Sequence, residues 1–353
     1  MDIGLFDFDL PEELIAQSPM KERDHCRLLV VNRETKTVEH KRFDDILDYL
    51  HEGDVLVRNN TKVIPARLLG IKRETKGHVE VLLLKQLKEK DVWECLVGNA
   101  RSVKVGSHVE FGDGLLVAEC VEVLPEGIRH MKFQYEGIFL EVLEQLGQMP
   151  LPPYIKKQVE DKNDYQTVYA SVPGSAAAPT AGFHFTPELF EKVKAKGVEV
   201  IDVTLTIGLG TFRPVKVQDT NDHHMHSEEY EISEIAAKRL NLAKKEGRRI
   251  IAIGTTSVRT LESNINKYGE FTPTKEDTAI FISPGYHYQA VDALITNFHL
   301  PKSPLVMLVS AFMGRKFTLS VYEEAVRERY RFFSFGDAMF IYGKCERNPG
   351  MDD

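Results

Sequence analysis

The sequence predicts an α/β fold: a mostly parallel sheet covered by helices, with an antiparallel β-barrel domain inserted into it. From about residue 64 to residue 135, short strand-like runs follow one another without a helix between them, which is typical of an antiparallel barrel. After residue 150, helix-like and apolar strand-like runs alternate, which is typical of a parallel sheet covered by helices. We therefore expect an α/β domain of residues 1–63 and 150–353, and an inserted barrel domain of residues 64–149.

The barrel segment contains strand-like runs separated by turn signals such as Gly112-Asp113-Gly114. The runs are HVEVLLLKQ, DVWECLVG, HVEFG, LLVAECVEVL and RHMKFQYEG. A helix from residue 138 to residue 146, ended by Gly147, closes this unit. The following segment, GQMPLPPYIKKQ, carries three prolines and predicts an extended, stiff crossing between the two domains.

The α/β segments carry helix caps and strand-like runs in alternation. Thr186 and Pro187 predict the start of a helix that ends at Gly197, and Ser233 predicts the start of one that ends at Gly247. Ser303-Pro304 predicts another helix start, and a last helix is expected over residues 322–331. Strands are expected at CRLLVVN, DVLVRN, VEVIDVTL, RRIIAIG, AIFIS and ALITNF.

Composition indicates a soluble, cytoplasmic globular protein. The N-terminus, MDIGLFDFDLPEEL, has neither a basic nor an apolar signal region, and the longest strongly apolar stretch is far shorter than a membrane span of ~20 residues. The net charge of −8 argues against a protein that coats nucleic acid without specificity. The four cysteines lie far apart with no CxxC spacing, so we expect reduced, mostly structural thiols; they are Cys26, Cys95, Cys120 and Cys345.

A basic strip lies between residues 55 and 76, with six basic residues and one acid, Glu74. A solvated face and a phosphate-contacting surface explain this strip equally well. The basic residues are Arg58, Lys62, Arg67, Lys72, Arg73 and Lys76.

Glycine and polar residues collect at strand ends, where open α/β sheets bind ligands. In GSAAAPTAGFHF the small residues allow a close approach of backbone to ligand, although a histidine such as His184 between two phenylalanines is more often packed. In IGLGTFRPV, Arg213 could bind a carboxylate or phosphate, or pair with a structural acid. In IAIGTTSVRTLES, Thr255 and Thr256 could bind an anion or nucleotide hydroxyls, or simply cap a helix, and Arg259 could pair with Glu262 or face a ligand.

The run DHHMHSEEY permits two interpretations. His223, His224 and His226 could bind a metal, but no second histidine pair or matching aspartate motif accompanies them, so we expect no metal. The sharper hypothesis is a general base at Glu228 or His226. Two further segments, ITNFHLPKSPLVMLVS and YRFFSFGDAM, add Asn297, His299 and Asp337 to the candidates, and their aromatic residues are expected in the core.

At these same segments the sequence resembles the S-adenosylmethionine:tRNA ribosyltransferase-isomerase family. The matching runs follow in order from Phe6 to Met339: FDFDLPEELIAQSP, NNTKVIPARLLG, MPLPPYI, YQTVYA, AAPTAGFHF, GLGTFRPV, MHSE, GTTSVRTLES, TNFHLPKS and YRFFSFGDAM. One departure is Thr206, where the family usually carries a histidine.

The resemblance implies an α/β catalytic domain with an inserted barrel, and an enzyme that needs no metal or other cofactor. Its substrate S-adenosylmethionine donates a ribosyl group to 7-aminomethyl-7-deazaguanine at the wobble position of tRNA, giving epoxyqueuosine-tRNA, adenine and methionine. We expect a monomer that contacts no membrane. A metal-dependent hydrolase and a non-catalytic tRNA-binding protein are the alternatives.

From this resemblance we expect catalytic roles for Glu228, His184 and Asp337, with the base at Glu228 or His184. Arg213 is expected to hold the methionine carboxylate, and Thr255, Thr256 and Arg259 to contact ribose or adenine. Further substrate-binding candidates are Thr180, His226, Asn297 and His299. The tRNA is expected to contact Arg58, Lys62, Arg67, Lys72, Lys156 and Lys157.

Overall fold

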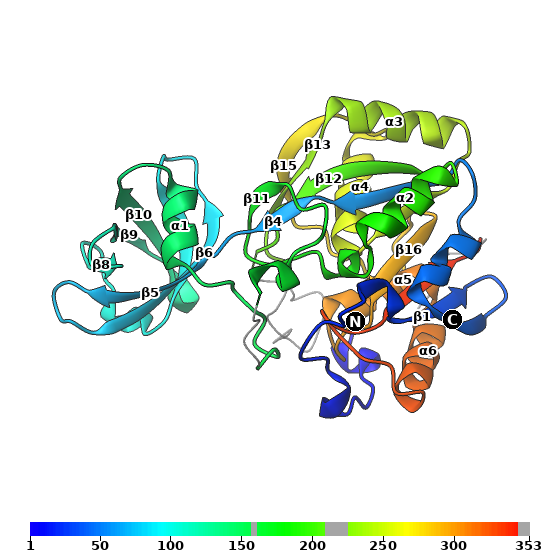
Figure 1. The fold of residues 1–353 in the computed structure, drawn as a ribbon, viewed down its shortest axis with the longest axis horizontal. Helices are drawn as coiled ribbons and strands as arrows, with labels where there is room; N and C mark the ends of the chain where they lie inside the picture. The colour runs from blue at the N-terminus through cyan, green and yellow to red at the C-terminus, as the bar shows by residue number, and fades with distance from the viewer. Residues whose placement is uncertain (157–160, 209–224, 345–353) are drawn as a thin grey trace.

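The larger part of the molecule is built on a mixed sheet with a parallel centre. The computed structural model describes residues 1–156, 161–208 and 225–344. Within these residues, nine strands form one sheet in the order β15-β13-β12-β3-β14-β16-β17-β1-β2 (Figure 1). The strands, in that order, are Thr274–Thr278, Glu228–Ile232, Glu199–Leu205, Val55–Asn59, Ile250–Ile253, Ala293–Asn297, Ala338–Tyr342, Arg27–Asn32 and Thr37–Arg42.

Four consecutive strands, β12, β3, β14 and β16, run parallel. The antiparallel pairs lie outside this group: β12 with β13, β13 with β15, β16 with β17, and β1 with β2. The predicted α/β class with an inserted antiparallel barrel is therefore confirmed. The sheet is mixed rather than mostly parallel, because its parallel pairs are confined to β12-β3-β14-β16 and to β17 with β1.

Both faces of the sheet are covered, as the apolar character of its strands requires. Along β1, Leu28 and Val30 point into one core, whereas Leu29 and Val31 point into the other, because successive side chains alternate across a strand. Helices α3 (Glu234–Lys245), α4 (Thr255–Tyr268), α5 (Pro304–Met313) and α6 (Arg315–Arg327) contribute to the larger core. Helix α2 (Pro187–Ala195) packs on the opposite face.

The inserted unit is a closed six-stranded antiparallel barrel in the order β10-β7-β6-β5-β8-β9. The strands, in that order, are Ile128–Tyr135, Val92–Val97, His78–Gln86, Arg67–Lys72, His108–Phe111 and Leu116–Val123, and helix α1 is Phe139–Leu146. The barrel has its own apolar core and lies to one side of the sheet (Figure 1). The bounds of the insert expected from the sequence, residues 64–149, remain our proposal.

The chain enters and leaves the barrel at one narrow neck. Arg67 and Gln148 exchange two backbone hydrogen bonds, of 3.1 and 2.8 Å. Gly147 fits here because a Cβ at this position would lie 2.0 Å from the carbonyl oxygen of Pro65. A parallel pair beside the neck, β4 (Thr61–Val63) and β11 (Val172–Ser175), belongs to the α/β part.

Most predicted elements are present, and the exceptions have physical reasons. The caps at Thr186, Ser233 and Ser303 each accept a hydrogen bond from a backbone N–H of the first helical turn. The strand expected at AIFIS is wrong: the strand is β15, the polar segment just before it, because that edge strand needs few apolar residues. The last helix begins earlier than expected and ends at Arg327.

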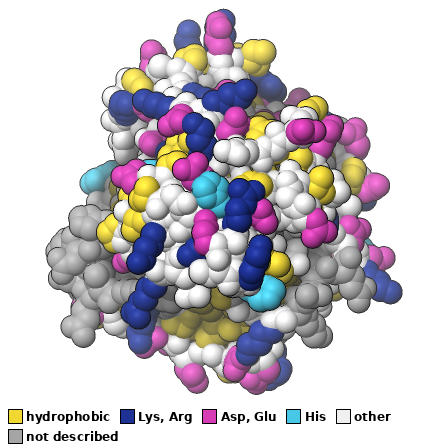
Figure 2. All heavy atoms as spheres, turned by 90° about the vertical axis from the view of Figure 1, so that its left-hand side faces the viewer, with side chains coloured by type: hydrophobic (Ala, Val, Ile, Leu, Met, Phe, Trp, Pro, Cys, Tyr) yellow, Lys and Arg dark blue, Asp and Glu magenta, His cyan; other side chains and the backbone are white. Residues whose placement is uncertain are grey.

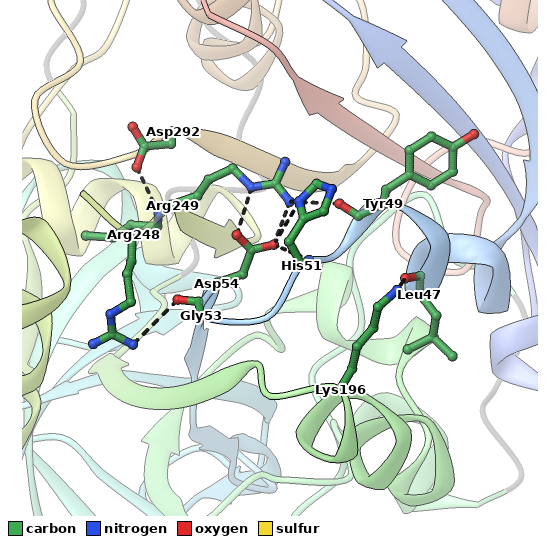
Figure 3. Close-up of polar contacts among 10 residues, drawn as sticks. Leu47, Tyr49, His51, Gly53, Asp54, Lys196, Arg248, Arg249 and Asp292 are labelled. Carbon is green, nitrogen blue, oxygen red and sulfur yellow. Dashed lines mark hydrogen bonds and ion pairs between the residues drawn. The ribbon is translucent and has the colours of Figure 1, made fainter. Parts of the chain in front are cut away.

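Charged residues close the amino edge of the parallel strands (Figure 3). Asp54, Arg249 and Asp292 each precede one strand, β3, β14 or β16. Arg249 donates to both carboxylate oxygens of Asp54, at 3.1 and 2.6 Å, and Asp292 accepts from the backbone N–H of Ile250 at 2.8 Å. These charges are used within the protein, so the ligand site is to be sought at the opposite edge.

No single helix in the described ranges is both long and apolar enough to cross a membrane; helices α5 and α6 together meet that test but are bent by 115°.

Candidate functional site

The carboxyl edge of the four parallel strands gathers residues that are far apart in sequence. Asn59 ends β3, Gly254 follows β14, and Asn297 ends β16. Because these strands are parallel, their carboxyl ends lie at one edge of the sheet. The short helix Thr180–His184 packs against β16 at the same place.

A small cavity of about 70 Å³ opens at this edge. Its wall includes five of the substrate-binding residues expected from the sequence: Thr180, Thr255, Thr256, Asn297 and His299. Ala177, Ala178 and Gly254 also line it, so the small-residue loop and the turn before α4 do lie at a shared cavity. Gly254 has a φ of +84°, a conformation that favours glycine, and this turn leads directly into α4.

Four side chains form a chain of hydrogen bonds that leads from the buried Cys26 to Thr180 in the cavity wall. Cys26 Sγ lies 3.1 Å from His184 Nδ1, and His184 Nε2 lies 2.6 Å from Asn297 Oδ1. Asn297 Nδ2 in turn donates to Thr180 Oγ1 at 2.9 Å. Both imidazole nitrogens of His184 are therefore engaged, which leaves neither free to act as a general base.

Burial keeps both histidines at this edge neutral. It lowers the pKa of His184 to about 4 and the pKa of His299 to about 3. His299 Nε2 lies 2.9 Å from Thr296 Oγ1. The small cavity thus receives no positive charge from either imidazole at neutral pH.

A second, larger cavity of about 730 Å³ lies between the barrel and the sheet. Glu228, His226, Thr206 and Gly208 form part of its wall on the sheet side. The barrel side is aromatic and apolar, and includes Trp93, Tyr135, Phe139 and Leu140. Lys85 of β6 and Asp277 of β15 form an ion pair across this boundary, with an N–O distance of 2.7 Å.

Glu228 is the buried acid of the large cavity. Its side chain and that of Arg259 are each 4% exposed, and Arg259 Nη1 donates to Glu228 Oε2. Glu228 Oε1 accepts from the backbone N–H of Gly208 at 3.0 Å. A buried carboxylate needs a compensating charge, and Arg259 supplies it. Arg259 lines neither cavity within the described residues, so it reaches a ligand only through Glu228.

The segment after β12 separates the two cavities. Thr206 and Gly208 line the large cavity, whereas Ile207 lines the small one. Successive residues of an extended segment face opposite sides. A ligand that spans both cavities would therefore pass around this segment, and Thr206, the position that departs from the family pattern, lies on its large-cavity side.

The remaining expected residues lie elsewhere or outside the described residues. Asp337 is buried and accepts from the backbone N–H groups of Arg27 and Arg331, at 2.9 and 2.7 Å, which is a structural arrangement. Arg213, His223 and His224 lie outside the described residues. Among the residues that the structure describes, no group of three His, Cys, Asp or Glu side chains could hold a metal ion.

The residues expected to contact tRNA are divided between the two parts of the molecule. Arg58, on β3, pairs with Asp202 at 2.6 Å, and Arg67, on β5, pairs with Glu80 at 2.9 Å. Lys72 donates to the carbonyl of Ser102 at 2.6 Å. Lys62 is exposed on β4, Lys156 pairs with Glu12, and Lys157 lies outside the described residues. Figure 2 shows basic and acidic side chains interspersed over the barrel end of the molecule, without a large basic field.

Sequence reasoning missed three contributors to the site. Cys26 was expected to be merely structural, yet its thiol contacts His184. Asn59 was not singled out, although an amide side chain at the carboxyl end of a largely buried strand is a usable signal. The aromatic barrel wall had no local signal, because its members come together only when the barrel closes and packs beside the sheet.

Comparison with known proteins gives two findings. A family model described as queuosine biosynthesis protein matches residues 3–341. A crystal structure of S-adenosylmethionine tRNA ribosyltransferase from Thermotoga maritima is similar to this chain, with 39% sequence identity and a TM-score of 0.56. That similarity covers 96% of this chain and 99% of the Thermotoga maritima chain.

Proposed function

We propose that this chain, which belongs to the queuosine biosynthesis protein family, is an S-adenosylmethionine:tRNA ribosyltransferase-isomerase. The reaction that we propose moves and isomerises the ribosyl group of S-adenosylmethionine. The acceptor is 7-aminomethyl-7-deazaguanine at the wobble position of tRNA, and the products are epoxyqueuosine-tRNA, adenine and methionine.

One observation carries the catalytic part of this proposal: a buried carboxylate, Glu228, faces the large cavity between the barrel and the sheet. The sulfonium of S-adenosylmethionine acidifies the C5′ hydrogens beside it, so that a carboxylate can remove one. Gly208 and Arg259 hold the carboxylate in place through its two oxygens. We assign the base to Glu228 rather than to His184, both of whose ring nitrogens are already hydrogen-bonded.

The aromatic wall of the barrel supports a role in holding the acceptor base. Trp93 and Tyr135 each lie against Phe139, with ring centroids 5.6 and 5.0 Å apart. Sequence-specific RNA recognition commonly takes an unstacked base onto aromatic side chains. A cavity of about 730 Å³ is within the range that binds small molecules, so the acceptor nucleobase and part of S-adenosylmethionine could share it.

The amine of the acceptor must be neutral when it attacks the ribosyl carbon. Removal from water lowers the pKa of an amine, and the apolar barrel wall of the cavity provides such an environment. After the transfer, the C–N bond to adenine and the C–S bond to methionine are both broken, so free adenine is a direct measure of turnover.

Adenine release tests the proposal. S-adenosylmethionine is mixed with tRNA that carries 7-aminomethyl-7-deazaguanine, and free adenine is measured by chromatography. We expect release by the unaltered chain, loss of release in Glu228→Gln, and normal release in the control Glu231→Gln, the same change at an exposed position of the same strand.

Each alternative outcome has a defined meaning. An active Glu228→Gln enzyme would remove the assignment of the base. Binding of tRNA without any adenine release by the unaltered chain would favour a non-catalytic tRNA-binding protein. A bound metal that is required for release would favour metal-dependent chemistry.

A further inference from the structure

The first turn of α4 opens into the small cavity without a side-chain cap. The residue before the helix, Gly254, has no side chain, and the first helical hydrogen bond runs from Val258 N to Gly254 O, at 3.3 Å. The backbone N–H groups of residues 255–257 therefore have no acceptor within the helix. Such a helix start carries a partial positive charge and favours an anion.

A threonine side chain at the same helix start, that of Thr255, faces the small cavity. Thr255 is 9% exposed and lines the small cavity, and its hydroxyl forms no hydrogen bond with any described residue. A hydroxyl that is accessible from a cavity and has no hydrogen bond within the protein can bind a ligand atom.

A second hydroxyl, that of Thr256, is oriented by Asn59. The Oδ1 atom of Asn59 accepts from the backbone N–H groups of Thr61 and Leu205, at 3.2 and 3.0 Å, which fixes the orientation of the amide. Asn59 Nδ2 must then be the donor to Thr256 Oγ1, at 3.2 Å. Because Thr256 Oγ1 accepts this bond, its own proton remains available to a ligand.

A third hydroxyl, that of Thr180, is oriented by the chain of hydrogen bonds that leads from Cys26. Burial raises the pKa of the Cys26 thiol, so the S–H group persists and donates to Nδ1 of His184. The neutral imidazole then carries its proton on Nε2 and donates it to Asn297 Oδ1. Asn297 Nδ2 is left to donate to Thr180 Oγ1, so the Thr180 proton is also free to be donated to a ligand.

We propose that this small cavity binds a carboxylate, namely the α-carboxylate of the methionine part of S-adenosylmethionine, through Thr180, Thr255, Thr256 and the first turn of α4. This inference rests on the proposed function. The three hydroxyls and the helix start are all donors, and no Asp or Glu lines the cavity among the described residues.

The donor set distinguishes a carboxylate from the other parts of the substrate. An adenine ring would require hydrogen-bond acceptors for its amino group as well as hydrogen-bond donors for its ring nitrogens. The carboxylate, in contrast, is the anionic group of S-adenosylmethionine and accepts hydrogen bonds only. A cavity of about 70 Å³ suits a group of a few atoms at the end of a longer molecule. The assignment differs from two sequence-based expectations: that Thr255 and Thr256 contact ribose or adenine, and that Arg213 holds the methionine carboxylate.

The test compares S-adenosylmethionine with its decarboxylated form, S-adenosylmethioninamine, by equilibrium binding. The variants Thr180→Val and Thr255→Val remove a hydroxyl with little change in shape, and each is expected to weaken S-adenosylmethionine binding by about 10-fold or more. Binding of the decarboxylated form should change less than about twofold, because the lost bond has no counterpart there. Thr180→Ser keeps the donor and should restore affinity, and the exposed Thr37→Val serves as control.

Asn297→Asp gives an independent measurement. A carboxylate at residue 297 would accept the Thr180 proton and place a negative charge in the cavity wall, so affinity for S-adenosylmethionine should fall while affinity for the decarboxylated form does not. If folded variants lose equal affinity for both compounds, or lose affinity for neither, the carboxylate assignment is overturned. Adenine release by the unaltered chain would still support the proposed function in that case. Absence of both binding and adenine release in the unaltered chain would instead overturn the proposed function, and this inference with it.

Discussion

The buried ion pair of Glu228 and Arg259 allows a quantitative test of how the proposed base is held. Glu228→Gln retains an oxygen for the backbone N–H of Gly208 but leaves the Arg259 charge buried without a counter-charge. Arg259 already has two nitrogens, Nε and Nη2, without a hydrogen-bond partner among the described residues. No described acceptor therefore stands ready to replace the lost carboxylate.

The expected magnitude follows from the burial of both partners, each 4% exposed. Removing one member of a buried pair costs ~3–5 kcal/mol, whereas replacing both with uncharged residues of similar volume is often nearly neutral. Glu228→Gln and Arg259→Met should each lower the free energy of unfolding by ~3–5 kcal/mol. The double variant should be more stable than either single variant, so that the two effects are strongly non-additive.

Urea denaturation followed by circular dichroism measures these energies, and adenine release is measured on the same samples below the unfolding transition. The double variant is expected to be folded and inactive, which separates the loss of the base from the loss of stability. Single variants that each lose less than ~1 kcal/mol, or a double variant that loses the sum of both, would refute the reasoning about the buried charge.

Three further perturbations follow from other parts of the structure. His184 and His299 have pKa values of about 4 and about 3 in the folded protein, against ~6.5 when unfolded, so the stability that they contribute is present above pH 6.5 and falls below it. Urea titrations should show a loss of about 4 kcal/mol between pH 7 and pH 5, and a flat profile would contradict the assigned neutral state. Asp54→Ala, at the amino edge, should lower the free energy of unfolding by ~3 kcal/mol yet leave adenine release per folded molecule unchanged. A loss of adenine release per folded molecule would instead indicate that the amino edge of the sheet takes part in the reaction. Charge reversal of Arg67 and Lys72 should weaken tRNA binding and reduce its dependence on salt concentration, and unchanged affinity would exclude this face of the barrel.

The sequence was sufficient for elements whose stability is local or strongly patterned. Thr186, Ser233 and Ser303 predicted helix starts correctly because a cap acts within one turn of the chain. The barrel strands were recognisable because alternating apolar residues mark a strand with one buried face. Strand β15 was not recognisable, since an edge strand such as TKEDT takes its hydrogen bonds from β13 rather than from an apolar pattern.

The candidate site was only partly predictable, because partners are chosen by the fold. Asn297 and His299 were identified from residue type at a strand end, and Thr180 from the family resemblance; the structure brings all three to one cavity. The partner of Arg259 was not predictable: Glu262, three residues away, instead accepts from Tyr286 and the backbone of residues 289–291. Only the antiparallel pairing of β13 with β12 brings Glu228 to Arg259.

The neck at Arg67 and Gln148 has a consequence for modularity. Since both ends of the barrel meet there in a backbone pair, removal of the segment between them would leave two chain ends already side by side, which a short turn could join. The sheet would lose few of its own contacts, because the barrel carries a separate core. The appended unit can therefore be exchanged while the sheet and the small cavity at its carboxyl edge, which has no wall residue from the barrel, keep their structure.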